Sequence, residues 1–316
     1  MAILNYNEAN QEFIFNQESD LPHIAKRAES ELFSPRGFHV IKNFIDKSVA
    51  DRIREYYTGQ NSSSFFADKS KLFAFHGQSQ IIYYPRSPFK NPRFIMSAYK
   101  NISLLRNRIY RNQDFYKQYC VGFKLNPDNF ESVYETQTHH TWARISWYKD
   151  HDGQCPHLDN YGEIAAFLIL SKKGVHWEKG GLFLYDKNGE RTVEVDTLCD
   201  IGDLLFLDQQ PHIHGVEPII GSKPGRLLFY VPIIPFNYIK PWFTFGGHPY
   251  KVFHSNPSPS LKDRAVAGIS NAWSYWKGTS PLHYSRKEFK HKTWELPPAC
   301  LEKNQSFETN DVLLKQ

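Results

Sequence analysis

The feature that most constrains the fold is a series of short apolar segments between about residues 141 and 233. Glycine, proline and aspartate residues separate these segments at close spacing. Each segment has the length of a strand and is bounded by turn signals, which favours strands over buried helices. Strands are predicted at 143–148, 164–170, 181–185, 192–195, 204–207, 212–216 and 226–233. Such a series is typical of a sandwich or jelly roll rather than of a parallel α/β sheet.

The chain outside this series is expected to be mainly helical, apart from a strand at 38–44. Apolar residues at helical spacing predict helices at 7–15, 23–33, 48–57, 97–111 and 114–119. The segment 60–95 is rich in aromatic residues and prolines, and it is interpreted as a long irregular lid or binding loop. After Tyr250, a further amphipathic helix is predicted from the stripe Val266, Ile269, Trp273 and Trp276, which core packing explains.

All 316 residues are expected to form one domain, because no repeat or low-complexity tract divides them. The fold class is mainly β with α decoration. Residues 1–140 would provide helical N-terminal support, with the lid at 60–95. Residues 141–235 would form the jelly-roll core, and 236–316 a C-terminal extension with a helix.

The composition excludes several classes of protein. The net charge is only +5 and the basic residues are dispersed, which argues against a nucleic-acid partner. A mean hydropathy of −0.55 without a long apolar run argues against a membrane span. The start of the chain lacks a secretory signal, so a cytoplasmic location is expected. The four scattered cysteines are interpreted as reduced thiols (Cys120, Cys155, Cys199 and Cys300).

Histidine is the chemically informative residue type, with 14 copies in the chain. In a strand, a histidine two residues before a carboxylate points both side chains to one face, where two metal ligands can converge. His157-Leu158-Asp159 has this pattern beside predicted strands. His176-Trp177-Glu178 has it too, but lies in a charged, glycine-rich connection and is interpreted as a loop. A third ligand is expected from 211–218, which contains His212 and His214.

Arg226 opens an apolar strand that is expected to be buried. A guanidinium in that position needs an anionic partner, because an unpaired charge in a medium of low dielectric constant is costly. A structural salt bridge would meet this need, and so would a ligand carboxylate held by two hydrogen bonds.

With these motifs in this order, the sequence resembles the Fe(II)/2-oxoglutarate-dependent dioxygenases. Within that family, it is most similar to the prolyl-hydroxylase-like branch. The resemblance covers about 141–233 well and 37–58 more loosely, and it implies a double-stranded β-helix core. The motifs that carry it are Tyr148, His157-Leu-Asp159, Gly180-Gly181-Leu-Phe-Leu, Ile201-Gly202-Asp203-Leu-Leu-Phe206, His214-Gly-Val-Glu-Pro218 and Arg226.

The resemblance implies that His157, Asp159 and His214 bind Fe(II) as the catalytic centre, two histidines and one carboxylate on one face of the metal. The His-x-Val-x-Pro context favours His214 over His212 as the ligand. By resemblance, Arg226 would hold the distal carboxylate of 2-oxoglutarate, and Tyr148 would add a hydrogen bond to it. With O2, the enzyme would oxidise an unactivated C–H bond and release succinate and CO2. Hydroxylation, desaturation and oxidative ring closure all remain open.

Four further residues are candidates for contacts to substrate or around the site. Arg144 and Ser146 alternate with Tyr148 along one strand, and core packing explains them equally well. Asn160 directly follows Asp159, and His212 is near the site or purely structural.

Within the resemblance, several branches are disfavoured. Asp159 argues against halogenases, which have a small residue at that position. Pro232 stands where the nucleic-acid dealkylating branch carries a second arginine, and Arg226 stands where histone demethylases usually have lysine.

The remaining alternatives concern the substrate and the class of protein. A small amino-acid-derived or secondary metabolite is preferred as substrate, because the aromatic segment 60–95 would cover a compact pocket. A peptidyl or protein hydroxylase is the alternative. A non-catalytic jelly-roll metal-binding protein is the alternative from another class, and Arg226 argues against a cupin enzyme that does without 2-oxoglutarate.

Overall fold

A computed structural model of the chain describes ten stretches of residues: 2–59, 67–68, 75–76, 78–82, 92–137, 143–157, 164–186, 188–209, 212–221 and 223–232. The predicted helix after Tyr250, most of the segment 60–95, and the residues Asp159 and Asn160 lie outside this description. None of the described helices combines the length and the apolar character that a membrane span requires.

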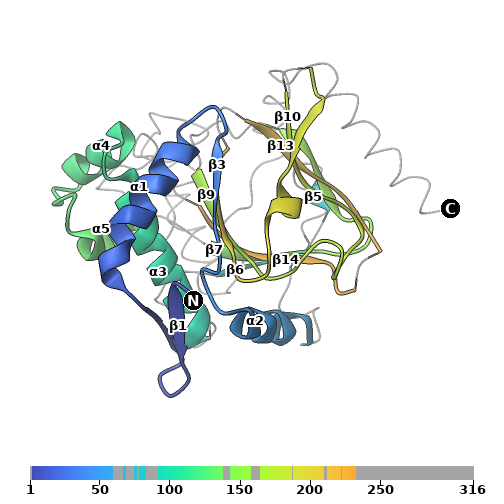
Figure 1. Cartoon of the computed structure of the whole chain (residues 1–316), viewed down its shortest axis with the longest axis horizontal. Helices are drawn as coiled ribbons and strands as arrows, with labels where there is room; N and C mark the ends of the chain where they lie inside the picture. Colours follow the sequence, from blue (N-terminus) through green and yellow to red (C-terminus); the bar gives the residue numbers. More distant parts are fainter. Residues whose placement is uncertain are drawn as a thin grey trace, which may run out of the picture.

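The described strands of the core form two antiparallel sheets, one of seven strands and one of five. In order across the larger sheet, the strands are β3 (Phe38–Ile41), β12 (Leu204–Asp208), β9 (Ile164–Ile169), β14 (Arg226–Pro232), β7 (Ala143–Tyr148), β6 (Gln78–Ile82) and β4 (Ala67–Asp68). The smaller sheet has β11 (Arg191–Glu194), β10 (Lys179–Tyr185), β13 (Ile213–Ile220), β8 (Gly153–His157) and β5 (Phe75–His76). The chain passes repeatedly from one sheet to the other, and Figure 1 shows the strands as two walls around a common interior.

All seven predicted strands between 141 and 233 are confirmed, with ends that shift by a few residues. The strand β8 was not predicted, because its sequence Gly-Gln-Cys-Pro-His has no apolar alternation. Short strands also occur in the segment 60–95, which was expected to be irregular. There, β5 pairs with β8 and β6 pairs with β7 at the edges of the two sheets.

The predicted helix at 7–15 is wrong, because this part of the chain is a hairpin of β1 (Leu4–Asn7) and β2 (Glu12–Phe15). The Asn7 side chain accepts hydrogen bonds from the backbone N–H groups of Ala9 and Asn10, which stabilises the turn. The backbone N–H of Phe13 donates to Ser97 Oγ at 2.7 Å. This distant contact and the local turn override the helical spacing of the apolar residues.

The predicted helices at 23–33, 48–57, 97–111 and 114–119 are confirmed as α1 (Leu21–Leu32), α2 (Lys47–Gly59), α3 (Arg93–Tyr110) and α4 (Asp114–Gly122). An unpredicted helix follows, α5 (Phe130–Gln137), and two short 3-10 helices are η1 (Glu18–Asp20) and η2 (Val195–Leu198). Helices α1, α3, α4 and α5 gather on one side of the sheets (Figure 1). There α1 contacts β3 and β12, and α3 contacts β14.

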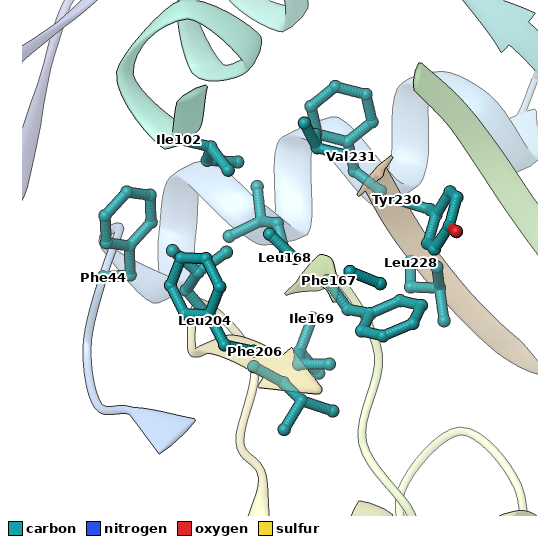
Figure 2. Packing of buried hydrophobic residues seen from close by; sticks show 14 of the residues in the cluster. Phe44, Ile102, Phe167, Leu168, Ile169, Leu204, Phe206, Leu228, Tyr230 and Val231 are labelled. Atoms are coloured by element: carbon teal, nitrogen blue, oxygen red, sulfur yellow. The ribbon is translucent and has the colours of Figure 1, made fainter. Parts of the chain in front are cut away.

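The main apolar core lies between these helices and the larger sheet. Because strand side chains alternate, every second residue of the central strands faces the helices. Leu168 of β9 and Leu204 of β12 are paired across the sheet and fully buried. Figure 2 shows them beside Phe44 and Ile102. Residues such as Tyr230 at the intervening positions face the interior between the two sheets.

We expect Leu204→Ala to lower the free energy of unfolding by about 2–5 kcal/mol, because it leaves a cavity in this core. Leu198→Ala is the matched control, since the Leu198 side chain is 40% exposed. Urea unfolding followed by circular dichroism measures both. Equal losses for the two variants would contradict the assignment of the core.

Candidate functional site

The two predicted histidine ligands come together in the smaller sheet. Strands β8 and β13 are antiparallel neighbours, and their register pairs His157 with His214. Residues at paired positions of an antiparallel ladder share a face of the sheet, with Cβ atoms about 4.5–5.5 Å apart. These residues are far apart in the sequence, and the fold sets them directly opposite each other.

The His214 imidazole is buried and held in one orientation. Its Nδ1 lies 2.9 Å from the carbonyl oxygen of His212, which can only accept, so Nδ1 carries the proton. The Nε2 atom is therefore an acceptor, and the Gln209 amide donates to it at 3.0 Å. A metal-binding histidine usually donates its other ring N–H to a carbonyl or carboxylate in this way. The tautomer of His214 is thus the one that binds a metal through Nε2.

A row of side chains links His214 to the opposite sheet. The Tyr230 hydroxyl donates to Gln209 Oε1 at 3.4 Å, and Gln209 is the residue that contacts His214. The Arg144 guanidinium carbon lies 4.5 Å from the centre of the Tyr230 ring. Arg144 and Tyr230 are also paired across β7 and β14. The interior near His214 therefore contains a polar side chain and a cationic side chain of the larger sheet, Tyr230 and Arg144.

The predicted cosubstrate residues, Arg226 and Tyr148, are paired across β14 and β7. The Arg226 guanidinium carbon lies 5.5 Å from the centre of the Tyr148 ring, and both side chains are buried. The Tyr148 hydroxyl donates to Gln154 Oε1 of the smaller sheet at 3.5 Å. Burial raises the pKa of the Tyr148 hydroxyl, although Arg144 and Arg226 oppose this shift. Tyr148 is therefore a neutral hydrogen-bonding group.

Arg226 forms a salt bridge with Asp196 of η2. Arg226 Nε donates to Asp196 Oδ2 at 2.7 Å, and Arg226 Nη2 donates to Asp196 Oδ1 at 3.0 Å. Burial alone would lower the pKa of the guanidinium, but the Asp196 carboxylate outweighs it and raises this pKa. Of the two partners expected for Arg226, the structure shows the salt bridge. Asp196 was not predicted, and its only sequence signal is an acidic residue between Val195 and Leu198 in a mostly apolar stretch.

Two other candidates lie beside these groups. Ser146 is buried between Arg144 and Tyr148 on β7, and its Oγ has no hydrogen-bond partner among the described residues. His212 is half-buried, and burial lowers the pKa of its imidazole, an effect that His214 increases and Asp208 opposes. The imidazole of His212 packs on Gly37 in the turn before β3. A Cβ atom on Gly37 would lie 1.9 Å from His212 Nε2.

His176 lies outside the strands, in the connection between β9 and β10, as interpreted from the sequence. The backbone N–H of Lys172 donates to His176 Nδ1 at 3.0 Å, and the imidazole is buried. Glu178, its neighbour in the motif, is exposed. His176 thus stabilises the connection.

Among the residues that the structure describes, no three His, Cys, Asp or Glu side chains form a group that could hold a metal ion. The predicted carboxylate ligand, Asp159, is not one of those residues, and the same holds for Asn160. The described part of the predicted ligand set is therefore the His214 side chain and the backbone pairing of His157.

No family model matches the chain, and no curated protein matches it in sequence. The structure is similar to a Pseudomonas putida prolyl-4-hydroxylase at 14% identity and TM-score 0.46, covering 67% of this chain and 99% of the other. It is similar to a Trichoplax adhaerens prolyl hydroxylase in complex with a hypoxia inducible factor peptide, at 13% identity and TM-score 0.48, covering 70% and 94%.

A third similar structure is the epimerase SnoN in complex with Fe3+, alpha ketoglutarate and nogalamycin RO. The identity is 11% and the TM-score 0.43, and the match covers 70% of this chain and 87% of that one. These solved structures include prolyl hydroxylases, the branch that the sequence resembles. At TM-scores below 0.5 and such low identity, the likenesses carry no weight for the activity or substrate of this chain.

We expect Gly37→Ala to lower the free energy of unfolding by about 1–3 kcal/mol, because the methyl group meets His212 and Gly37 has a φ of 70°. Adding His212→Ala removes the steric clash but not the backbone strain. A double-mutant cycle from urea unfolding curves measures the coupling of the two sites. Additive losses would show that the two residues do not contact each other.

Proposed function

We propose that this chain is an Fe(II)- and 2-oxoglutarate-dependent oxygenase. It would oxidise an unactivated C–H bond in a small, amino-acid-derived or secondary metabolite and release succinate and CO2. The observation that carries the proposal is the pairing of His157 with His214 on neighbouring strands. Two histidines next to a carboxylate from the same His-x-Asp motif make a ligand set suited to non-heme Fe(II).

The strand order supports a double-stranded β-helix for the core. Consecutive strands β7, β8, β9 and β10 alternate between the two sheets, and β12, β13 and β14 alternate again. A jelly roll is built in this way, from eight strands wound between two facing sheets. Counting β11, the strands β7 to β14 number eight. His157 ends the second of them, β8, and His214 lies near the start of the seventh, β13, so the winding itself makes them neighbours.

The residues present fit a bound iron ion. His214 presents an acceptor Nε2 and is fixed by the His212 carbonyl, and His157 and Asp159 would complete the ligand set. Iron bound there would supply the oxidation of the substrate by O2 and 2-oxoglutarate. The protein would orient the ligands, hold the distal carboxylate of 2-oxoglutarate at Arg226, and donate to this cosubstrate from the Tyr148 hydroxyl. The buried interior between the sheets would exclude water.

The preference for a small substrate concerns the segment 60–95, of which the structure describes three strands and the start of α3. Its strands β5 and β6 add to the two sheets beside β8 and β7, the strands that carry His157 and Tyr148. The described strands of this segment therefore extend both sheets at their edges, beside β8 and β7. We propose, from the aromatic composition of this segment, that it would cover a compact pocket rather than line an open peptide groove.

We expect His214→Ala to lose most of its affinity for Fe(II), because the Nε2 ligand is removed, and Asp159→Ala to do the same. Anaerobic equilibrium dialysis with a colorimetric iron assay measures binding without turnover. His176→Ala is the control, since it removes another buried histidine and should leave the iron affinity unchanged. Wild-type affinity in His214→Ala would contradict the assignment of the ligands.

The activity is tested with a panel of amino acids and other metabolites, assayed for succinate that forms only when a substrate is present. We expect at least one compound to couple succinate release to a product that gains one oxygen atom or loses two hydrogen atoms in mass spectrometry. A parallel panel of proline-containing peptides tests the protein-hydroxylase alternative. Iron and 2-oxoglutarate binding without any succinate release would instead favour a non-catalytic protein.

A further inference from the structure

The Arg226–Asp196 salt bridge raises a question about how the site would bind a second carboxylate. The guanidinium is planar and offers hydrogen bonds along two edges. Asp196 occupies the edge formed by Nε and Nη2. The edge formed by Nη1 and Nη2 is the one on which a carboxylate of the cosubstrate would be held. Arg226 thus has its own counter-ion before any ligand arrives.

The position of the Asp196 carboxylate is built into the fold. The backbone N–H of Leu182 donates to Asp196 Oδ2 at 2.7 Å. Gly181, next to it, has a φ of 116°, and a Cβ atom there would lie 2.4 Å from the same oxygen. Both side chains of the salt bridge are nearly inaccessible, with exposures of 3% and 4%. The Leu182 N–H and the Arg226 guanidinium therefore both bind this carboxylate, and the absence of a side chain at Gly181 leaves room for it.

We propose that Asp196 is an internal counter-ion of Arg226 that competes with the distal carboxylate of 2-oxoglutarate and thereby sets the affinity for this cosubstrate. The inference rests on the proposed function. Without ligand, Asp196 spares the protein the cost of an unpaired buried charge. With ligand, the paired guanidinium attracts an incoming anion less strongly than an unpaired one would. Asp196 is in this sense a positioning residue, because it acts on the cosubstrate through Arg226.

The inference predicts that Asp196→Asn destabilises the protein without ligand and at the same time strengthens the binding of 2-oxoglutarate. Asparagine has nearly the same shape but no charge, so the protein without ligand should unfold at a lower temperature. The ligand carboxylate then becomes the main counter-charge of Arg226. We expect the Kd for 2-oxoglutarate to fall about fivefold or more, and the cosubstrate to raise the melting temperature more than it does in the wild type.

The measurement uses the full chain loaded with Zn(II), which is redox-inert, with calorimetric titration and thermal melting in 2-oxoglutarate. Glu194→Gln is the matched control. It removes the charge of a carboxylate two positions away, which pairs with Lys173 instead of Arg226. This control should leave the Kd for 2-oxoglutarate unchanged. A purely structural salt bridge would lower the melting temperature of Asp196→Asn without changing the Kd.

The outcomes separate this inference from the proposed function. If the wild type binds 2-oxoglutarate and Asp196→Asn binds it equally or more weakly, the inference is overturned and the proposed function stands. Wild-type binding in Arg226→Gln would overturn it as well, because the cosubstrate would then be held elsewhere. Absence of 2-oxoglutarate binding to the wild type would overturn both.

A second measurement covers the case in which Asp196→Asn does not fold. The Leu182 amide donates to Asp196, so its NMR resonance reports on that carboxylate in the Zn(II)-loaded wild type. Saturating 2-oxoglutarate should shift this resonance as Arg226 divides its hydrogen bonds between two carboxylates. An unmoved Leu182 resonance in the saturated protein would overturn the inference.

Discussion

The alternation of side chains along β14 is the constraint on which the rest of the structure depends. This strand lies between β9 and β7, so both of its edges are paired, and its residues from Arg226 to Val231 are buried on both faces. One set of its residues, including Phe229 and Val231, completes the apolar layer under the helices. The other set, Arg226, Leu228 and Tyr230, faces the interior between the sheets. A slip of one residue would exchange the two sets and place a guanidinium in the apolar core.

The polar groups inside the sandwich hold the two sheets in one relative position. Arg226 reaches Asp196 in the segment that leaves the smaller sheet, Tyr148 reaches Gln154, and Tyr230 reaches His214 through Gln209. Apolar packing alone tolerates many arrangements, whereas buried hydrogen bonds require defined partners. The residues proposed for catalysis and cosubstrate binding are thus among those that fix the position of one sheet relative to the other.

Seven strands of the core, β7 and β9 to β14, were predictable, because each is a short apolar segment with turn residues at its ends. The two histidines were predictable as candidates, since His-x-Asp and His-x-Val-x-Pro are local motifs. Their pairing across β8 and β13 was not, because β8 has no apolar pattern and register depends on the partner strand. The N-terminal hairpin and Asp196 were missed for a related reason. Ser97 and Arg226 determine their structure from distant parts of the chain.

The contact between Gly37 and His212 ties a turn near the N-terminus to the orientation of a candidate metal ligand. The carbonyl of His212 fixes the His214 ring, while the His212 ring packs against Gly37 at the end of the turn after α1. A displacement of this turn would therefore act first on His212, the residue whose carbonyl holds His214 Nδ1. The turn that follows helix α1 is thus linked to His214 through the contacts of His212. Substitutions between α1 and β3 would then affect the candidate metal site from outside it.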